Sequence, residues 1–102
     1  MTKKKNYEVL VVDDVLSAAN DYARLIETKI GLQVAYTSDV EEALKYVQYN
    51  DMKVLVLDQK MPVTGTQLLE KLRPFTSARA IMLTGEADKE ELGNAINPNF
   101  HA

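Results

Sequence analysis

The chain alternates short apolar runs with longer segments in which apolar residues recur every three or four positions. Apolar runs rich in valine and leucine and bounded by turn residues are typical of buried parallel strands, whereas the longer spacing is typical of helices with one buried face. The strands are predicted over these ranges: Glu8–Val12, Gln33–Tyr36, Lys53–Leu57 and Ala80–Leu83. The helices are predicted over these: Val15–Lys29, Ser38–Asn50, Gly65–Arg73 and Lys89–Ile96.

Residues that start and stop helices support these boundaries. Ser38 with Glu41, and Thr64 with Gln67, have the spacing of a capping box, in which each residue of the pair bonds the backbone N–H of the other. Gly31 provides a left-handed stop for the first helix. The buried face of that helix is expected to consist of the apolar residues Leu16, Ala19, Ala23, Ile26 and Ile30.

Strands and helices that alternate along a chain form a parallel sheet, because each helix returns the chain to the edge where the next strand starts. We therefore expect an α/β fold with helices on both faces of the sheet. The sequence shows four strands, with only the approach to a fifth in its last residues.

Composition narrows the class of protein. The chain has 102 residues, of which 46% are hydrophobic and 26% charged, and this suits one soluble domain. It has no cysteine, which excludes disulfides and thiolate metal sites. The absence of a long apolar segment or signal peptide predicts a cytoplasmic protein that does not enter the membrane. The net charge of −3 argues against nucleic-acid contact by this segment.

Three acidic residues stand at the ends of two of the apolar runs. Asp13 and Asp14 follow Val9–Val12, and Asp58 follows Val54–Leu57. Neighbouring parallel strands bring their carboxyl ends to one edge of the sheet, where open α/β sheets bind ligands. Three carboxylates there would repel one another unless a cation joined them, and oxygen ligands favour Mg²⁺. Taken alone, Asp13 or Asp14 could simply cap the first helix, but the three acids together predict an acidic pocket for Mg²⁺.

Beyond these acids, the chain resembles the receiver domain of bacterial two-component response regulators. Three segments carry the resemblance: Val9–Asp14, Val54–Gly65 with its Asp-x-x-Met-Pro-x-x-Gly pattern, and Ala80–Gly85. The resemblance implies a flavodoxin-like doubly wound parallel sheet with strand order 2-1-3-4. It also implies that residues 1–102 form one receiver domain, in which residues 1–5 are a flexible tail.

The implied function is that of a phosphoacceptor in histidine-to-aspartate signalling rather than of an enzyme that turns over a metabolite. Asp58 matches the phosphoacceptor, which takes its phosphoryl group from a sensor histidine kinase or a phosphotransfer protein. Asp14, Asp58 and the backbone carbonyl of Lys60 match the direct Mg²⁺ ligands, and Asp13 matches the acid that holds the metal through water. The groups that match phosphoryl-oxygen donors are the Thr84 hydroxyl and the backbone N–H groups of Gln59 and Gly85.

The chain departs from the family pattern at its C-terminal end. A fifth strand with a Lys-Pro pair, and a fifth helix, are expected in the family but have no counterpart before Ala102. We interpret the chain as a truncated receiver, with a natural degenerate receiver as the alternative and an output domain expected beyond Ala102. The fourth strand would then be an edge strand, which favours a homodimer or an exchange of segments between copies.

Three other functions are alternatives to the phosphoacceptor. A pseudo-receiver that binds partners without phosphorylation is favoured by the missing lysine and opposed by the complete set of acids. A Mg²⁺-dependent phosphatase would show a second acid two residues after the nucleophile, where this chain has Lys60. A flavin-binding protein would need a phosphate loop rich in Ser, Thr or Gly after the first strand.

One further hypothesis concerns the mouth of the pocket. Lys60 and Glu86 each lie two residues beyond a pocket residue, and in a receiver-like fold they would flank the phosphoryl group. An ion pair between them would restrict access of water and slow dephosphorylation. Alternatively, Lys60 would approach the phosphoryl group and partly replace the missing lysine.

Overall fold

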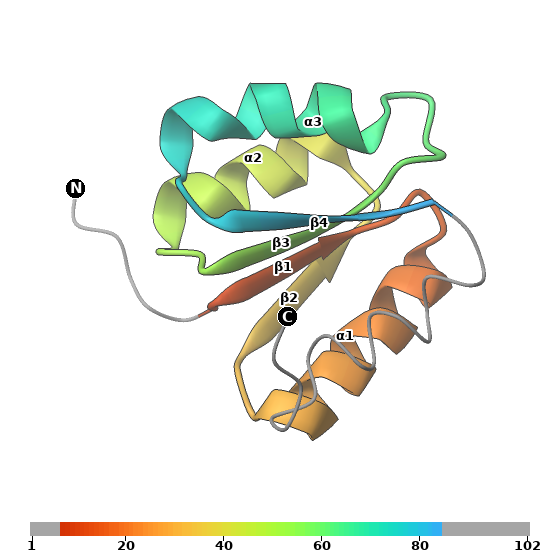
Figure 1. The fold of residues 1–102 in the computed structure, drawn as a ribbon, viewed down its shortest axis with the longest axis vertical. Coiled ribbons are helices and arrows are strands. Elements are labelled where there is room, and N and C mark those ends of the chain that lie inside the picture. Colours follow the sequence, from red (N-terminus) through yellow and green to blue (C-terminus); the bar gives the residue numbers. More distant parts are fainter. Residues whose placement is uncertain (1–6, 85–102) are drawn as a thin grey trace.

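A parallel sheet forms the centre of the molecule, for which a computed structural model describes residues 7–84 (Figure 1). Its strands are β1 (Val9–Val12), β2 (Val34–Thr37), β3 (Val54–Asp58) and β4 (Arg79–Leu83). They lie in the order β2-β1-β3-β4, and all neighbours are parallel. The predicted strands and their order are confirmed, with boundaries shifted by one residue at most.

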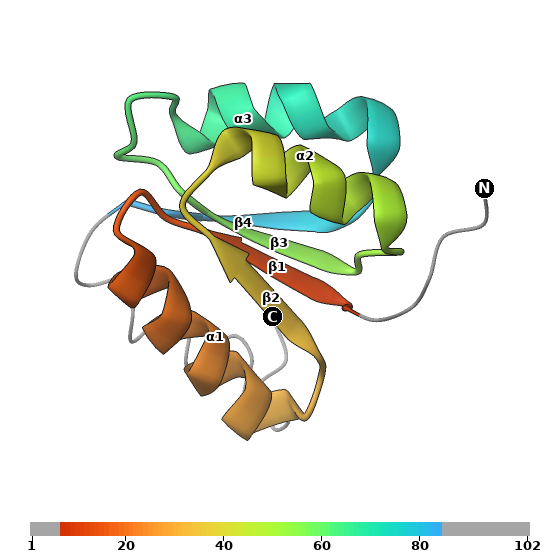
Figure 2. The same cartoon turned by 180° about the vertical axis from the view of Figure 1, so that it is seen from behind.

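Helices cover both faces of this sheet. They are α1 (Leu16–Ile30), α2 (Val40–Tyr49) and α3 (Gly65–Leu72), and a 3-10 turn at Arg73–Phe75 follows the last. Seen from opposite sides, α1 lies on one face, and α2 and α3 lie together on the other (Figures 1 and 2). Among residues 7–84, no helix is long and apolar enough to cross a membrane.

The remaining predicted elements fall elsewhere in the chain. The tail at residues 1–5 and the helix at Lys89–Ile96 lie outside the described residues. A fifth strand and a fifth helix are not among the elements of residues 7–84.

The core consists of two layers, one on each side of the sheet. All four residues of β1 are buried, because this strand is central and covered on both faces. Side chains alternate along a strand, so β1 and β3 contribute to both layers. The layer under α2 and α3 includes Leu10, Leu55, Leu57, Leu68 and Leu72. The layer under α1 includes Val9, Val11, Val56, Ala23 and Ile26.

Two of the three predicted caps are confirmed. Gly31 has φ 69°, and its N–H donates to the Glu27 carbonyl. Thr64 and Gln67 form a capping box at the start of α3. The assignment of Ser38 as a cap is wrong, because the backbone is still extended at Asp39. The Asp39 carboxylate accepts a hydrogen bond from the Glu42 N–H at 3.1 Å, so Asp39 caps α2.

The prediction that Leu16 belongs to the buried face of α1 is also wrong. Leu16 is the first residue of the helix, and its side chain is 53% exposed. Helical side chains lean toward the N-terminus of their helix, so a side chain in the first turn projects past the edge of the sheet. Tyr22, which is not among the apolar residues expected on that face, is 8% exposed and packs in the layer under α1.

Candidate functional site at the carboxyl edge of the sheet

The three acids meet at the carboxyl edge of the sheet. Val12 pairs with Leu57 across β1 and β3, so the residues that follow these strands lie side by side. Asp13, Asp14 and Asp58 each offer a carboxylate oxygen within 4.8 Å of the others. The convergence expected from the ends of the two apolar runs is therefore present in the fold.

Asp13 is the least accessible of the three acids. Only 8% of it is exposed, and its Oδ1 accepts a hydrogen bond from the Val15 N–H at 2.9 Å. Burial raises the pKa of Asp13 above its ordinary value, the Val15 bond opposes this, and the neighbouring charges of Asp58 and Asp14 raise the pKa further. A positive partner would therefore stabilise the ionised form of Asp13.

The described residues do not provide that partner as a side chain. Within residues 7–84, no ion pair joins the cluster to a Lys or Arg, and the ion pair that is present links Lys53 and Glu8 at 3.2 Å. Lys53 and Glu8 precede β3 and β1, at the opposite edge of the sheet. A set of carboxylate oxygens with a buried member of raised pKa suits a hard divalent cation such as Mg²⁺. The donor chemistry thus fits the metal that the sequence suggested.

The loop after β3 places a backbone group beside Asp58. The Lys60 N–H donates to Asp58 Oδ1 at 3.0 Å, which brings the Lys60 backbone to the half-buried carboxylate. Gln59 differs from expectation, because its N–H donates to the Leu83 carbonyl at 2.8 Å. That N–H continues the ladder between β3 and β4. The expectation that it serves as a pocket donor is therefore wrong for this structure, and the Lys60 N–H is the backbone donor at the carboxylate.

The expected hydroxyl donor lies at the same edge of the sheet. Asp58 pairs with Leu83 across β3 and β4, and Thr84 is the next residue, with an exposed side chain. Gly85 and Glu86 lie outside the described residues, and so does the expected pairing of Lys60 with Glu86.

One contact of the loop after β3 has no signal in the sequence. The side-chain amide of Gln59 reaches Thr66 in the first turn of α3 and bonds both its backbone N–H and its hydroxyl. Two polar residues seven positions apart match no local motif, so only the path of the loop reveals this contact.

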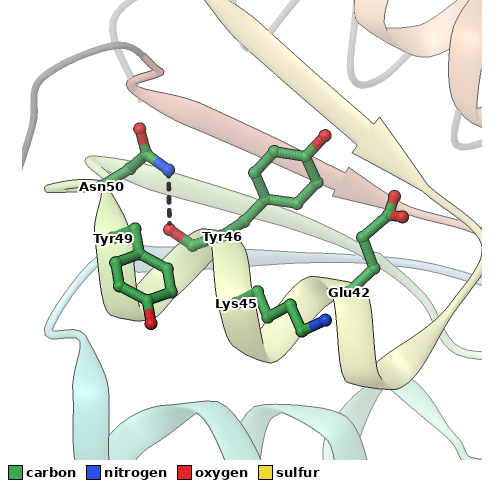
Figure 3. A pocket seen from close by; sticks show the side chains of 5 residues that line it. All are labelled: Glu42, Lys45, Tyr46, Tyr49 and Asn50. Carbon is green, nitrogen blue, oxygen red and sulfur yellow. Dashed lines mark hydrogen bonds between the residues drawn. The ribbon is translucent and has the colours of Figure 1, made fainter.

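A separate depression of about 220 Å³ lies on α2 (Figure 3). Its lining residues are Glu42, Lys45, Tyr46, Tyr49 and Asn50. The Asn50 amide donates to the Tyr46 carbonyl at 3.0 Å, and Tyr7 packs edge-on against the Tyr46 ring with centroids 5.7 Å apart. The depression extends to the C-terminal end of α2, which precedes β3 and therefore lies at the edge opposite to the acids. It takes no part in the acidic site.

Comparisons with known proteins identify the family. The family model of the response regulator receiver domain matches residues 9–101 of the sequence, and the chain therefore belongs to this family. Receiver domains are signalling phosphoacceptors that bind Mg²⁺ at an acidic pocket and interact with histidine kinases or phosphotransfer proteins. None of the curated protein sequences gives a significant match.

Solved structures agree with this assignment. The chemotaxis protein CheY4 of Vibrio cholerae is 25% identical, with a TM-score of 0.68 over 93% of this chain and 88% of that chain. The receiver domain of the Francisella response regulator 1452 is 29% identical, with a TM-score of 0.56 over 93% and 82% of the two chains. A response regulator from Burkholderia pseudomallei was solved with a phosphorylated aspartic acid, calcium ion and citrate. It is 22% identical, with a TM-score of 0.67 over 88% of this chain and 55% of that chain, and supports the fold alone.

Proposed function

We propose that Asp58 accepts a phosphoryl group from a phosphohistidine of a sensor histidine kinase or phosphotransfer protein. The observation that carries this proposal is the convergence of three carboxylates within 4.8 Å at the end of β1 and β3. An acceptor carboxylate must approach an anionic phosphoryl group, and an acidic cluster can allow this only when a cation is bound.

In the proposed transfer, a carboxylate oxygen of Asp58 attacks phosphorus and forms an acyl phosphate. The bond between phosphorus and the histidine nitrogen breaks, and its electron pair stays on the imidazole. The groups proposed to hold Mg²⁺ are Asp14, Asp58 and the backbone carbonyl of Lys60, with Asp13 acting through water. When bound, Mg²⁺ supplies the positive charge that offsets the repulsion between the carboxylate and the phosphoryl group.

Donors around Asp58 would hold the transferred group. The Lys60 N–H already contacts the carboxylate, at 3.0 Å. The Thr84 hydroxyl and the Gly85 N–H are the further proposed donors to phosphoryl oxygens, because both follow the strand that pairs with β3. Lys60 and Glu86 are proposed to flank the mouth and to set the rate of dephosphorylation.

Phosphorylation would act as a switch in the cytoplasm. The domain would exist in an equilibrium between inactive and active conformations, and phosphorylation of Asp58 would shift it toward the active one. An output domain or a second copy of the chain would bind the surface that the active conformation presents.

Because β4 lies at the edge of the described sheet, pairing between copies is proposed to use this strand. Sedimentation at high concentration tests the pairing, and a well-folded monomer contradicts it.

The phosphoacceptor role is tested by incubating the full chain with acetyl phosphate and Mg²⁺ and measuring intact mass. We expect the mass of one phosphoryl group to be added, and its loss with EDTA or with Asp58→Asn. Asp51→Asn is the matched control, because Asp51 is an exposed acid just before β3, at the opposite edge of the sheet. A folded protein that gains no mass contradicts the proposal and favours a pseudo-receiver that binds partners without phosphorylation. Labelling that persists in Asp58→Asn assigns the acceptor elsewhere.

A further inference from the structure

The Gln59 side chain links the end of β3 to the start of α3. Its Oε1 accepts a hydrogen bond from the Thr66 N–H at 2.8 Å. Its Nε2 donates to the Thr66 hydroxyl oxygen at 2.9 Å, and that hydroxyl also lies 3.3 Å from Oε1. We call this contact the Gln59–Thr66 bridge. It closes the loop of residues 60–64, which contains Lys60.

The bridge contacts a backbone donor that α3 cannot satisfy by itself. The first N–H groups of a helix have no partner within the helix. Thr64 accepts from the N–H of Gln67, and the Gln67 side chain accepts in return from the Thr64 N–H. The Thr66 N–H is not part of this capping box, and it donates instead to Gln59 Oε1. The bridge therefore fixes where α3 begins relative to Asp58, independently of the cap.

Two anchors hold the backbone of Gln59 and Lys60 in place. The Gln59 N–H bonds the Leu83 carbonyl at 2.8 Å, which ties it to β4. The Lys60 N–H bonds Asp58 Oδ1 at 3.0 Å. Gly65 leaves room for the Gln59 amide, because a Cβ on Gly65 would lie 2.8 Å from Gln59 Oε1. The amide therefore lies directly against the first turn of α3.

We propose that Gln59 is a positioning residue for the metal site. Its bridge to Thr66 closes the loop so that the Lys60 backbone faces Asp58 before any ion binds. The inference rests on the proposed function, in which the Lys60 carbonyl is a Mg²⁺ ligand. The hydrogen bonds of the bridge are exposed to water and add little to the stability of the fold, so their main effect is to preorganise the loop. Without the bridge, the Lys60 N–H bond to Asp58 is the remaining restraint on Lys60, so ion binding must also order part of the loop, which weakens the affinity.

The test is the affinity of the unphosphorylated full chain for Mg²⁺, measured by titration of backbone amide NMR signals. Gln59→Leu keeps the size of the side chain but removes both bonding atoms. We expect its dissociation constant for Mg²⁺ to rise about tenfold, the lower end of the loss seen when a partner of a metal-ligating group is removed. Gln48→Leu is the matched control, because Gln48 is exposed near the C-terminal end of α2, and its affinity should equal that of the wild type.

Variants of Thr66 test the bridge from its other end. Thr66→Val removes the hydroxyl but keeps the N–H, so we expect an intermediate loss of affinity. Thr66→Ser keeps both groups and should restore affinity to within about twofold of the wild type. If both residues act through one contact, the double variant Gln59→Leu/Thr66→Val will be no weaker than Gln59→Leu alone.

A second measurement in metal-free protein separates positioning from general stability. Gln59→Leu should speed hydrogen exchange of the Lys60 amide while the amides of β1 keep their wild-type protection. Unchanged Mg²⁺ affinity in Gln59→Leu overturns the inference, and so does an equal loss in Gln48→Leu. If Gln59→Leu weakens Mg²⁺ binding but acetyl phosphate never labels the wild type, the positioning role stands and the proposed phosphoacceptor function fails.

Discussion

The buried acid of the cluster predicts an unusual response to neutralisation. Asp13→Asn removes the charge of Asp13 but retains an oxygen that can accept the Val15 N–H bond. We expect this substitution to stabilise the metal-free protein, because it removes repulsion with Asp58 and Asp14 and the burial of a charge. Most substitutions of buried residues destabilise, so the sign of the change is diagnostic.

The distances within the cluster set the magnitude. The carboxylate oxygens lie within 4.8 Å of one another. At this upper limit, two unit charges repel by about 0.9 kcal/mol in a water-like medium and by about 3.5 kcal/mol at an effective dielectric constant of 20. The Asp13 carboxylate is buried and the Asp58 carboxylate is partly exposed, so we expect a gain of about 1–3 kcal/mol in the free energy of unfolding. In a domain of this size, 1 kcal/mol corresponds to a Tm increase of about 4–8 °C.

The pH dependence of stability provides an independent test of the destabilising effect of Asp13. The folded pKa of Asp13 lies above its ordinary value of 3.8, so the folded state holds the proton more tightly than the unfolded chain does. Between these two pKa values the native state binds more protons, and the contribution of Asp13 to stability falls as pH rises through the window. Above the folded pKa, the destabilisation caused by ionised Asp13 no longer changes with pH. In Asp13→Asn, the free energy of unfolding should not show this decrease as pH rises.

Urea denaturation in EDTA and then in Mg²⁺ measures these effects. Mg²⁺ should stabilise the wild type strongly and Asp13→Asn only weakly, because binding to the native state raises the free energy of unfolding. Asp51→Asn carries the same change of charge at the opposite edge and should follow the wild type. The reasoning is refuted if Asp13→Asn is less stable than the wild type in EDTA, or if Mg²⁺ stabilises both proteins equally.

Three further substitutions test single contacts. Gly65→Ala would place a methyl group 2.8 Å from Gln59 Oε1 and Met82 Sδ and 3.1 Å from the Asp58 carbonyl oxygen. We expect the better helix propensity of alanine to offset part of the steric cost, so that stability falls by about 1–3 kcal/mol at most, while Mg²⁺ affinity also falls. Unchanged affinity in titration would argue against this. Thr64→Ala should lower the free energy of unfolding in urea by about 1 kcal/mol through loss of the α3 cap, whereas Thr64→Ser should retain it. Asn50→Ala should lower the free energy of unfolding by about 1–3 kcal/mol, measured by thermal denaturation, because this buried amide bonds the chain before β1 and the last turn of α2. A smaller loss would mean that water replaces the amide in these hydrogen bonds.

The elements that the sequence predicted well are those set by continuous patterns. The four residues of β1 are apolar because the strand is covered on both faces, and so short a run between polar residues indicates a strand rather than a helix. The acids at the strand ends follow from the same pattern, since parallel pairing fixes the edge at which they meet. The capping box at Thr64 and Gln67 needs only local spacing, and it was correctly predicted.

The errors arise where a neighbouring residue or a tertiary contact decides. Ser38 and Asp39 are both good caps, and only the direction of the chain leaving β2 selects Asp39. Leu16 satisfies the helical spacing but lies beyond the sheet that would cover it. The roles of the Gln59 N–H and of its side chain depend on β4 and α3 respectively, and no pattern of period two or four in the sequence encodes either contact.

The place of β1 in the sheet has a consequence during synthesis of the chain. The acids that end β1 leave the ribosome well before Asp58, yet β1 gains its neighbour β3 only after β2 and α2 have been made. An incomplete nascent chain therefore has two of the three carboxylates and no closed cradle for an ion. Under the proposed function, Mg²⁺ would bind only after β3 has docked and the third carboxylate has joined the other two.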